Sequence, residues 1–360
     1  MTHESRAPLQ MNSWLKLMGA PRAGNNPDRL DSKAGRCELP PASLQHLEKA
    51  LKKQWKRYRK ELKRCQGEFS ETAIHDSRVQ ARRLLSTVEL LEGCLPDQRV
   101  KKAERALKRH LDEFDDLRDT QVQLSIVGKV LKTFASARVF HEYLLQREKC
   151  FARRTRKKIR GIKTGLLAKV VSACRADVDK KRKKSSSKQA SDLLLRALDR
   201  AFSRTVELAS RIKPSDTKTI HRTRVAFKRF RYMVEALADY LPRVNEKFLE
   251  ALHHYQSMMG DIQDAEVLRQ AMEEYLAKQK VKPATARPLC DELLRRRQWL
   301  IRVYLQAADQ LLEFWPLTGA GVKGASTSRP AIAHLRTLAR STLRATEKDP
   351  AKKKMRTGIR

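Results

Sequence analysis

Two short segments of the chain repeat one pattern of histidine and basic residues, 146 positions apart. Residues 74–83 (IHDSRVQARR) align without a gap on residues 220–229 (IHRTRVAFKR). On a helix, positions n, n+3, n+7 and n+14 lie within about 60° of one another. The spacing therefore predicts two stripes of like composition, formed by His75, Arg78, Arg82 and Glu89 and by His221, Arg224, Lys228 and Glu235.

The chemistry that these stripes offer is the binding of a polyanion. Like charges at helical spacing destabilise a helix by roughly a few tenths of a kcal/mol each, so a basic stripe is favourable only where something negative neutralises it. Arg231 falls at nearly the same angle as Arg224 and adds to the second stripe. We interpret the two stripes as basic surfaces that hold a polyanion between them.

The charge of the whole chain agrees with a polyanionic partner. Lys and Arg number 78 against 41 Asp and Glu, which gives a net charge of +37. Residues 41–316 hold 61 of the bases and 35 of the acids, so this part alone carries +26. The excess is thus not confined to a basic tail, and it predicts an electrostatic footprint on the folded part.

Apolar residues recur at steps of three and four along most of the chain, which predicts helices. No alternating segment rich in Val and Ile predicts a strand. We expect an all-α protein with two antiparallel helical bundles, a first half at about 41–180 and a second at about 191–316, joined by a Lys/Ser linker at about 180–190. The expected helices are 44–62, 72–92, 98–115, 120–134, 137–160 and 162–178, then 191–212, 217–241, 244–259, 262–279 and 286–313.

The two flanks differ from the helical part. Residues 1–40 contain clusters of Gly, Pro and Asn with little periodicity, which predicts disorder. Residues 317–360 form a basic C-terminal tail with a short helix at about 330–346. No stretch approaches the 18 or so apolar residues of a membrane span, and the first residues do not form a signal peptide, so we expect a cytoplasmic protein without a membrane partner.

A second internal match contains paired carboxylates. Residues 116–122 (DLRDTQV) resemble residues 261–267 (DIQDAEV). Such pairs are compatible with acid–base chemistry or a magnesium site. Aspartates at the start of a helix also accept hydrogen bonds from free backbone N–H groups, and we favour this capping interpretation for Asp116, Asp119, Asp261 and Asp264.

Two motifs of the form His-x-x-Arg-Val-x-x-Arg/Lys-Arg, each followed some forty residues later by Asp-Leu/Ile-x-Asp, resemble the CHAD family, the conserved histidine α-helical domain. The resemblance covers about residues 43–313. It implies a pair of helical bundles with pseudo-two-fold symmetry around a basic cavity that binds inorganic polyphosphate, and stand-alone members that associate with polyphosphate granules. Carried over by position, the polyphosphate-binding residues are His75, Arg78, Arg82, Arg83, His221, Arg224, Lys228, Arg229 and Arg231.

The first half departs from the second at two positions of this motif. Leu85 and Ser86 stand where the second half has Arg231 and Tyr232, so the first basic surface is expected to be the weaker one. A further local match, between residues 144–147 and 293–296, makes Arg147 and Arg296 candidates for additional contacts, although a solvated charged face explains them equally well.

Two other function classes compete with polyphosphate binding. A nucleic-acid-associated protein is supported by the net charge, but aromatic residues make up only 6% of the chain, and single-stranded nucleic acid is normally held by aromatics interleaved with bases. Phe227, Phe230 and Tyr232, which lie near the second stripe, are interpreted as core residues. A polyphosphate- or triphosphate-processing enzyme is less favoured, because the chain has no Glu-x-Glu-x-Lys strand and no phosphate-binding loop.

The six cysteines are scattered without a C-x-x-C pair, which indicates neither a zinc site nor a disulfide framework. We therefore expect no metal, no cofactor and no catalytic residue. The oligomeric state is left open by the sequence.

Overall fold

The computed structural model describes residues 43–92, 97–184, 187–241, 244–279 and 283–315, together with 333–334 and 336–337. These residues are almost entirely helical and contain no strand, which confirms the all-α prediction. The flank 1–40 and most of the tail 317–360 lie outside the described residues. The elements are α2 (Ser43–Glu68), α3 (Glu71–Leu90), α4 (Asp97–Asp112), α5 (Asp115–Gly128), α6 (Ala135–Arg160), α7 (Gly165–Lys184), α8 (Ser187–Ala209), α9 (Thr217–Leu237), α10 (Glu246–Gln279) and α11 (Pro283–Gln306), with short 3₁₀ turns at Ala238–Tyr240 and Ala308–Glu313.

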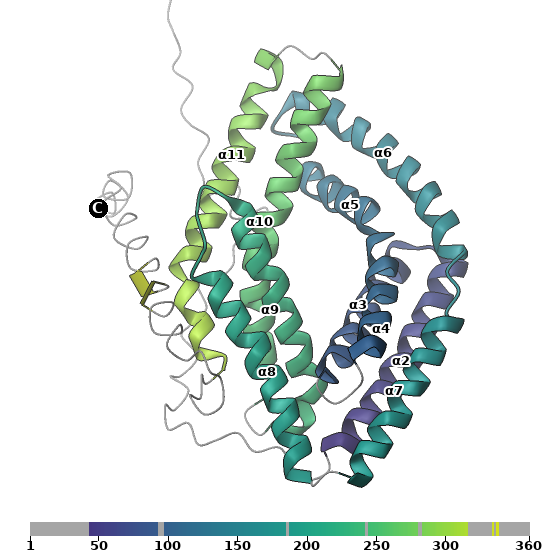
Figure 1. Cartoon of the computed structure of the whole chain (residues 1–360). Helices are drawn as coiled ribbons and strands as arrows, with labels where there is room; N and C mark the ends of the chain where they lie inside the picture. Colours follow the sequence, from purple (N-terminus) through teal and green to yellow (C-terminus); the bar gives the residue numbers. More distant parts are fainter. Residues whose placement is uncertain are drawn as a thin grey trace, which may run out of the picture.

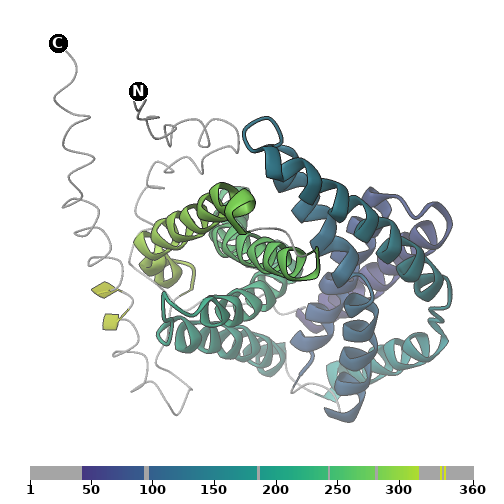
Figure 2. The same ribbon diagram turned by 90° about the horizontal axis from the view of Figure 1, so that it is seen from above.

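The helices form two groups that lie side by side (Figures 1 and 2). The first group holds α2 to α7 and the second holds α8 to α11. Helices α3 and α9, which carry the repeated basic pattern, pack against each other between the groups. The repeated sequence is therefore brought together in space by the fold.

The two groups also meet through shared apolar cores. The larger core contains Leu51 and Leu84 of the first group together with Phe202 and Phe230 of the second. A smaller core joins α5 and α6 to α10 and α11, where the ring of Tyr275 lies 5.2 Å from Phe140 and 5.0 Å from Tyr143. Contact at both cores fixes the groups relative to each other. Phe227, Phe230 and Tyr232 are buried, as predicted.

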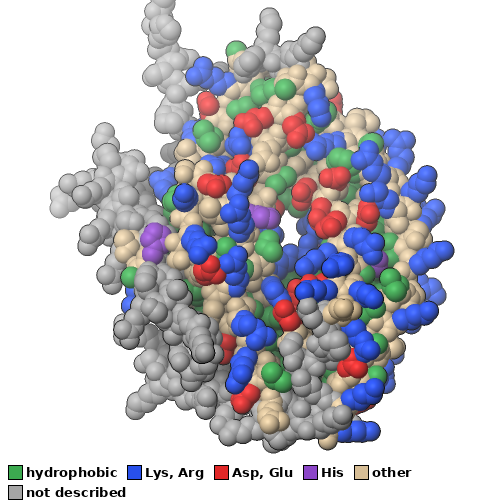
Figure 3. All heavy atoms as spheres, in the orientation of Figure 1, with side chains coloured by type: hydrophobic (Ala, Val, Ile, Leu, Met, Phe, Trp, Pro, Cys, Tyr) green, Lys and Arg blue, Asp and Glu red, His purple; other side chains and the backbone are tan. Residues whose placement is uncertain are grey.

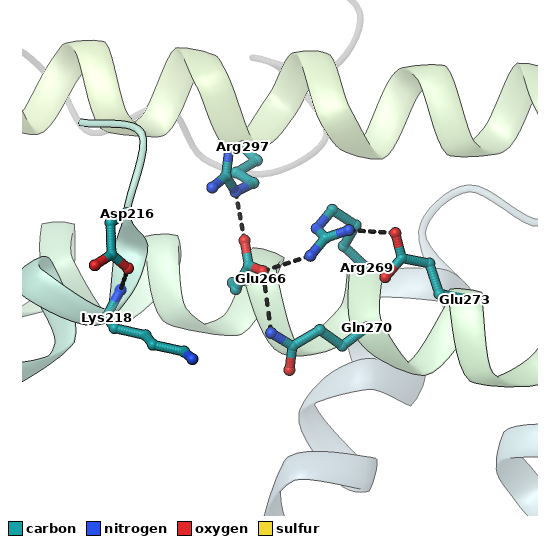
Figure 4. A network of polar contacts seen from close by, with 7 residues as sticks. All are labelled: Asp216, Lys218, Glu266, Arg269, Gln270, Glu273 and Arg297. Carbon is teal, nitrogen blue, oxygen red and sulfur yellow. Dashed lines mark hydrogen bonds and ion pairs between the residues drawn. The ribbon is translucent and has the colours of Figure 1, made fainter. Parts of the chain in front are cut away.

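Helices α3 and α9 each begin at a side-chain cap, which sets the place of the histidine one turn further on. The Ser70 hydroxyl accepts a hydrogen bond of 3.2 Å from the backbone N–H of Ala73, and the Asp216 carboxylate accepts one of 3.0 Å from Lys218 N–H. Both caps satisfy N–H groups that a helix start leaves free. The second of these caps is drawn in Figure 4.

Helix α10 corrects two predictions. The helices expected at 244–259 and 262–279 are one continuous helix, with Gly260 in its interior. Asp261 and Asp264 therefore lie inside a helix and cap nothing. In the first half, α5 begins at Asp115 after Phe114, and no side chain caps it. The capping interpretation of the repeated aspartates is wrong.

The predicted linker is also shorter than expected. Helix α7 continues to Lys184 and α8 begins at Ser187, so most of residues 180–190 are helical. No helix among the described residues is long and apolar enough to span a membrane.

Helices α10 and α11 are tied by a buried carboxylate (Figure 4). Glu266 of α10 is only 7% exposed, and it accepts hydrogen bonds from Arg297 of α11, from Arg269 at 2.7 Å and from Gln270 at 3.0 Å. Because each oxygen of this carboxylate has a donor, the buried charge is compensated.

Candidate anion-binding cavity

A cavity of about 1800 Å³ lies between the two groups and is lined by residues of both. Helices α2, α3, α4 and α5 contribute from one side, and α8, α9 and α10 from the other. Figure 3 shows Lys and Arg side chains beside the hollow in this face of the molecule, with acidic side chains among them. All nine residues predicted as the polyphosphate site line this cavity, namely His75, Arg78, Arg82, Arg83, His221, Arg224, Lys228, Arg229 and Arg231.

Arg82, Arg224 and Lys228 form what we call the open cluster. They are half-buried, and none of the three forms an ion pair or a hydrogen bond with another described residue. The Arg224 guanidinium packs against Gly260 of α10, where a Cβ would lie 3.6 Å from Nε. Desolvated cations without a direct ion pair raise the free energy of the empty site. The Asp264 carboxyl interacts electrostatically with Arg224 and Lys228 but forms an ion pair with neither.

The pKa of Lys228 is lowered by this environment. Burial, acting together with the neighbouring charges of Arg82, Arg224 and Arg78, lowers the pKa of its ammonium to about 6. Burial also lowers the pKa of Arg82, with Arg224 acting in the same sense. The cavity thus concentrates positive charge where water cannot fully solvate it.

Arg78 has a different role. It is 6% exposed, and its guanidinium donates to the Phe114 carbonyl at 3.2 Å and to the Asp115 carboxylate at 3.0 Å. Burial lowers its pKa to about 10. These bonds tie α3 to the junction of α4 and α5, so Arg78 supports the cavity wall.

Arg83 and Arg229 join the two basic helices through reciprocal ion pairs. Arg83 Nε of α3 lies 3.6 Å from a Glu235 oxygen of α9, and Arg229 Nε of α9 lies 3.0 Å from a Glu89 oxygen of α3. Glu92 pairs with Arg229 as well, at 3.1 Å. The stripe glutamates therefore hold the opposite helix, which sequence spacing alone did not indicate.

Arg231 is also engaged within the protein. It lies 3.4 Å from Glu235, and its guanidinium is 4.5 Å from the centre of the Tyr232 ring. The two histidines face the cavity, and burial lowers the pKa of each. Arg118 adds to this effect at His75 and Arg224 adds to it at His221. Both imidazoles are consequently neutral near pH 7 and offer neutral hydrogen-bonding groups.

The two additional candidates lie elsewhere. Arg147 pairs with Glu274 at 3.4 Å and packs over the ring of Phe151 at 5.3 Å. Neither Arg147 nor Arg296 is among the residues that line the cavity. The local match between residues 144–147 and 293–296 therefore did not mark cavity residues.

Several lining residues were missed by the sequence. Arg118, Asp119 and Asp264 belong to the repeated acidic motif and face the cavity. Burial, together with Asp115, raises the pKa of Asp119 to about 6, and burial raises that of Asp264. The repeated acidic segments could have marked these residues as cavity residues, but we interpreted their aspartates as helix caps. Arg57, Lys108, Arg200, Arg204 and Arg222 also line the cavity, without any repeated signal.

The described residues contain no group of three or more His, Cys, Asp or Glu side chains placed to hold a metal ion. Within the same residues Cys65 and Cys174 are buried free thiols, and Cys150 is exposed.

Comparisons with known proteins identify the fold. The structure is similar to the crystal structure of the CHAD domain from the plant Ricinus communis, with 16% sequence identity, a TM-score of 0.53, and coverage of 86% of this chain and 97% of that chain. PptA from Streptomyces chartreusis is similar at 13% identity and a TM-score of 0.49, covering 84% of this chain and 99% of that chain. No curated protein matches the sequence. The CHAD domain family model matches residues 46–273, which is more than half of the 360 residues, and the chain therefore belongs to the CHAD family.

Proposed function

We propose that the chain binds inorganic polyphosphate in the cavity between α3 and α9 and that this binding places it on polyphosphate granules. The observation that carries the proposal is the open cluster, in which Arg82, Arg224 and Lys228 share the cavity, half-buried, without a direct ion pair to a carboxylate of the described residues. Guanidinium groups and ammonium groups are the side chains that bind phosphate oxygens most strongly. An entering phosphate chain would supply the missing negative charge. The CHAD family is related in general to polyphosphate and triphosphate binding.

The lining of the cavity favours a polyanion without bases. Tyr232 is the only Phe, Tyr or Trp among the described lining residues, and it is buried beneath Arg231. A single-stranded nucleic acid would need exposed aromatic faces for stacking. Polyphosphate needs only donors and cations. We further propose that the protein acts by binding, without chemistry of its own.

The direct test is a titration of the purified chain with long-chain polyphosphate and with single-stranded DNA at matched phosphate concentration. We expect polyphosphate to bind at least about tenfold more tightly, a difference of about 1.4 kcal/mol. Affinity should fall as salt rises, because each neutralised phosphate releases counterions. Tighter binding of DNA, or an affinity that salt does not change, would contradict the proposal. Measuring orthophosphate during the titration tests whether the protein binds without catalysis, and its release would contradict that claim.

The lowered pKa of Lys228 predicts that affinity depends on pH. In the free protein this amine loses its proton as pH rises through about 6, whereas a bound phosphate chain favours the ammonium. Binding then takes up a proton above pH 6, so affinity should fall by several-fold per pH unit between pH 7 and 9, with tenfold per unit as the limit for one proton. Isothermal titration in buffers of different ionisation enthalpy measures the proton uptake.

Lys228→Met is the matched control, because it keeps an unbranched side chain only one atom shorter and removes the titrating group. Its affinity should change little over the same range, and proton uptake should disappear. In the unbound protein, the free energy of unfolding should instead rise with pH. Since the folded pKa of Lys228 lies below the unfolded value of 10.5, its contribution to the free energy of unfolding rises with pH between about 6 and 10.5. Identical pH profiles for both proteins would rule out Lys228 as the titrating group.

A further inference from the structure

The C-terminal half of α6 presents a second concentration of positive charge, outside the cavity. Residues 149–176 contain no Asp or Glu. The bases of this stretch are Lys149, Arg153, Arg154, Arg156, Lys157, Lys158, Arg160, Lys163, Lys169 and Arg175. None of them lines the cavity, since no cavity residue comes from α6 or α7.

Five of these bases lie on one face of the helix. At about 100° per residue they fall within about 100° of one another, and they span about 16 Å along the axis. Thr155 and Ile159, on another side of α6, are buried against the core. We call this exposed face the outer stripe, and it consists of Lys149, Arg153, Arg156, Lys157 and Arg160. In Figure 3, Lys and Arg side chains follow the right-hand edge, where Figure 1 places α6 above α2 and α7.

The outer stripe has no carboxylate partners in the part of the chain that the structure describes. Several exposed arginines of other helices pair with an acid one turn away, as Arg204 does with Glu207 at 2.7 Å and Arg295 with Glu292 at 2.8 Å, whereas the exposed lysines of α2 resemble the stripe in forming no ion pair with a described residue. Among the described residues, no member of the outer stripe forms an ion pair. Repulsion within the stripe is therefore uncompensated until an anion binds.

The surroundings of the outer stripe favour a polyanion without bases here as well. The nearest aromatics are half-buried under guanidinium groups, with Arg154 5.8 Å from the Phe151 ring and Arg156 5.9 Å from the Phe69 ring. Neither ring offers a free face for stacking. The stripe is a row of point charges and guanidinium forks, which is what an extended phosphate chain requires.

We propose that the outer stripe is a second polyphosphate-binding surface, which engages chains long enough to extend beyond the cavity and so links different protein molecules along one chain. The proposal rests on the function proposed above. A long chain held in one cavity offers free phosphates at high local concentration, so even weak contacts at the stripe raise the overall affinity. A short chain that fills only the cavity gains nothing from the stripe.

The test removes four charges from the stripe and compares a long chain with a short one. The variant is Lys149→Gln, Arg153→Gln, Arg156→Gln and Arg160→Gln. The matched control removes four exposed charges from α2, as Lys49→Gln, Lys52→Gln, Lys53→Gln and Lys56→Gln, none of which lines the cavity. Affinities for long-chain polyphosphate and for tripolyphosphate are measured for each protein, with light scattering to follow assembly on the long chain. Circular dichroism checks that both variants are folded.

We expect the stripe variant to bind the long chain about tenfold more weakly, to scatter less light, and to keep its tripolyphosphate affinity within about twofold. The α2 control should lose no more than about threefold on the long chain. Equal losses in both variants would overturn the proposal in favour of a general charge effect. If the stripe variant loses affinity for tripolyphosphate as much as for the long chain, the substitutions affect the cavity site itself, and the proposal of a second surface is also overturned.

The remaining outcomes separate this proposal from the one on which it rests. If the unaltered protein binds neither chain, the proposed function itself fails. If it binds both, and the stripe variant keeps full affinity for the long chain, only the second surface is refuted. A stripe variant that loses binding to double-stranded DNA, while its binding to polyphosphate is unchanged, would assign the surface to nucleic acid.

Discussion

Replacing Arg82 and Lys228 together by glutamine is expected to weaken polyphosphate binding by about 100-fold to 10,000-fold. Hydrogen bonds to charged groups contribute about 1.5–3 kcal/mol each, so the loss of two gives about 3–6 kcal/mol, at about 1.4 kcal/mol per factor of ten. The free protein should be as stable as before or more so, because the variant removes the desolvated Arg82 cation and the buried Lys228 amine, neither of which forms an ion pair with another described residue. Titration with polyphosphate and thermal unfolding measure the two effects.

A double variant outside the cavity controls for the loss of net charge. Arg147→Gln with Arg295→Gln removes the same charge from residues that do not line the cavity and that pair with acids. Its affinity should stay within about threefold of the unaltered protein, since exposed ion pairs contribute about 0–1 kcal/mol. If the two double variants bind alike, or if the cavity variant keeps its affinity while its circular dichroism stays native, the site lies elsewhere.

Replacing Glu266 by glutamine is expected to lower the free energy of unfolding by about 2–4 kcal/mol. Removing one member of a buried ion pair costs about 3–5 kcal/mol, and the partial exposure of Arg269 reduces this. The neutral amide would leave Arg297 with its charge uncompensated beside α10. Denaturant unfolding at pH 7 measures the difference. Polyphosphate affinity should not change, because Glu266 does not line the cavity.

Glu273 supplies a control on the same helix. It pairs with Arg269 but is exposed, so Glu273→Gln should cost less than about 1 kcal/mol. A further control uses pH. Burial acts to raise the pKa of Glu266, but hydrogen bonds from Arg269 and Arg297 outweigh it and lower the pKa. The stabilisation is thus present above about pH 4.5 and lost as pH falls, so the gap between the two proteins should close in acid. A gap that is constant down to pH 2 would mean that packing, not charge, is responsible.

The helical fold was predictable from periodicity, but one of its longest elements was not. Separate helices were expected at 244–259 and 262–279, and the glycine at position 260 between them costs about 1 kcal/mol relative to alanine in a helix interior. Helix α10 continues through this point since Met259 and Ile262 on either side are buried, and burying each contributes about 1.5–3 kcal/mol. The glycine also leaves room for Arg224 to pack against the helix. Tertiary contacts of this kind are invisible in a single sequence.

The sequence identified which side chains gather at the cavity but not which of them are free. Arg78 and Arg82 occupy equivalent positions on one stripe, yet only Arg78 meets the Phe114 carbonyl and Asp115. Those partners come from the α4–α5 junction, some 36 residues away in the chain. Likewise, Arg83 and Arg229 are engaged because α3 and α9 pack against each other. Roles of this sort depend on distances that repeat spacing does not encode.

The reciprocal ion pairs fix the position of α3 relative to α9. Positions 83 and 89 of α3 meet positions 235 and 229 of α9, so the two helices run antiparallel with a defined register. Sliding one helix by a single turn, about 5.4 Å, would break both pairs together and separate the buried Glu89 from its cation. The offset between Arg82 and Lys228 is therefore a fixed length, set before any anion arrives. If the cavity binds a polyanion as proposed, we expect it to favour polymers whose charges repeat at a matching distance over polymers of equal total charge.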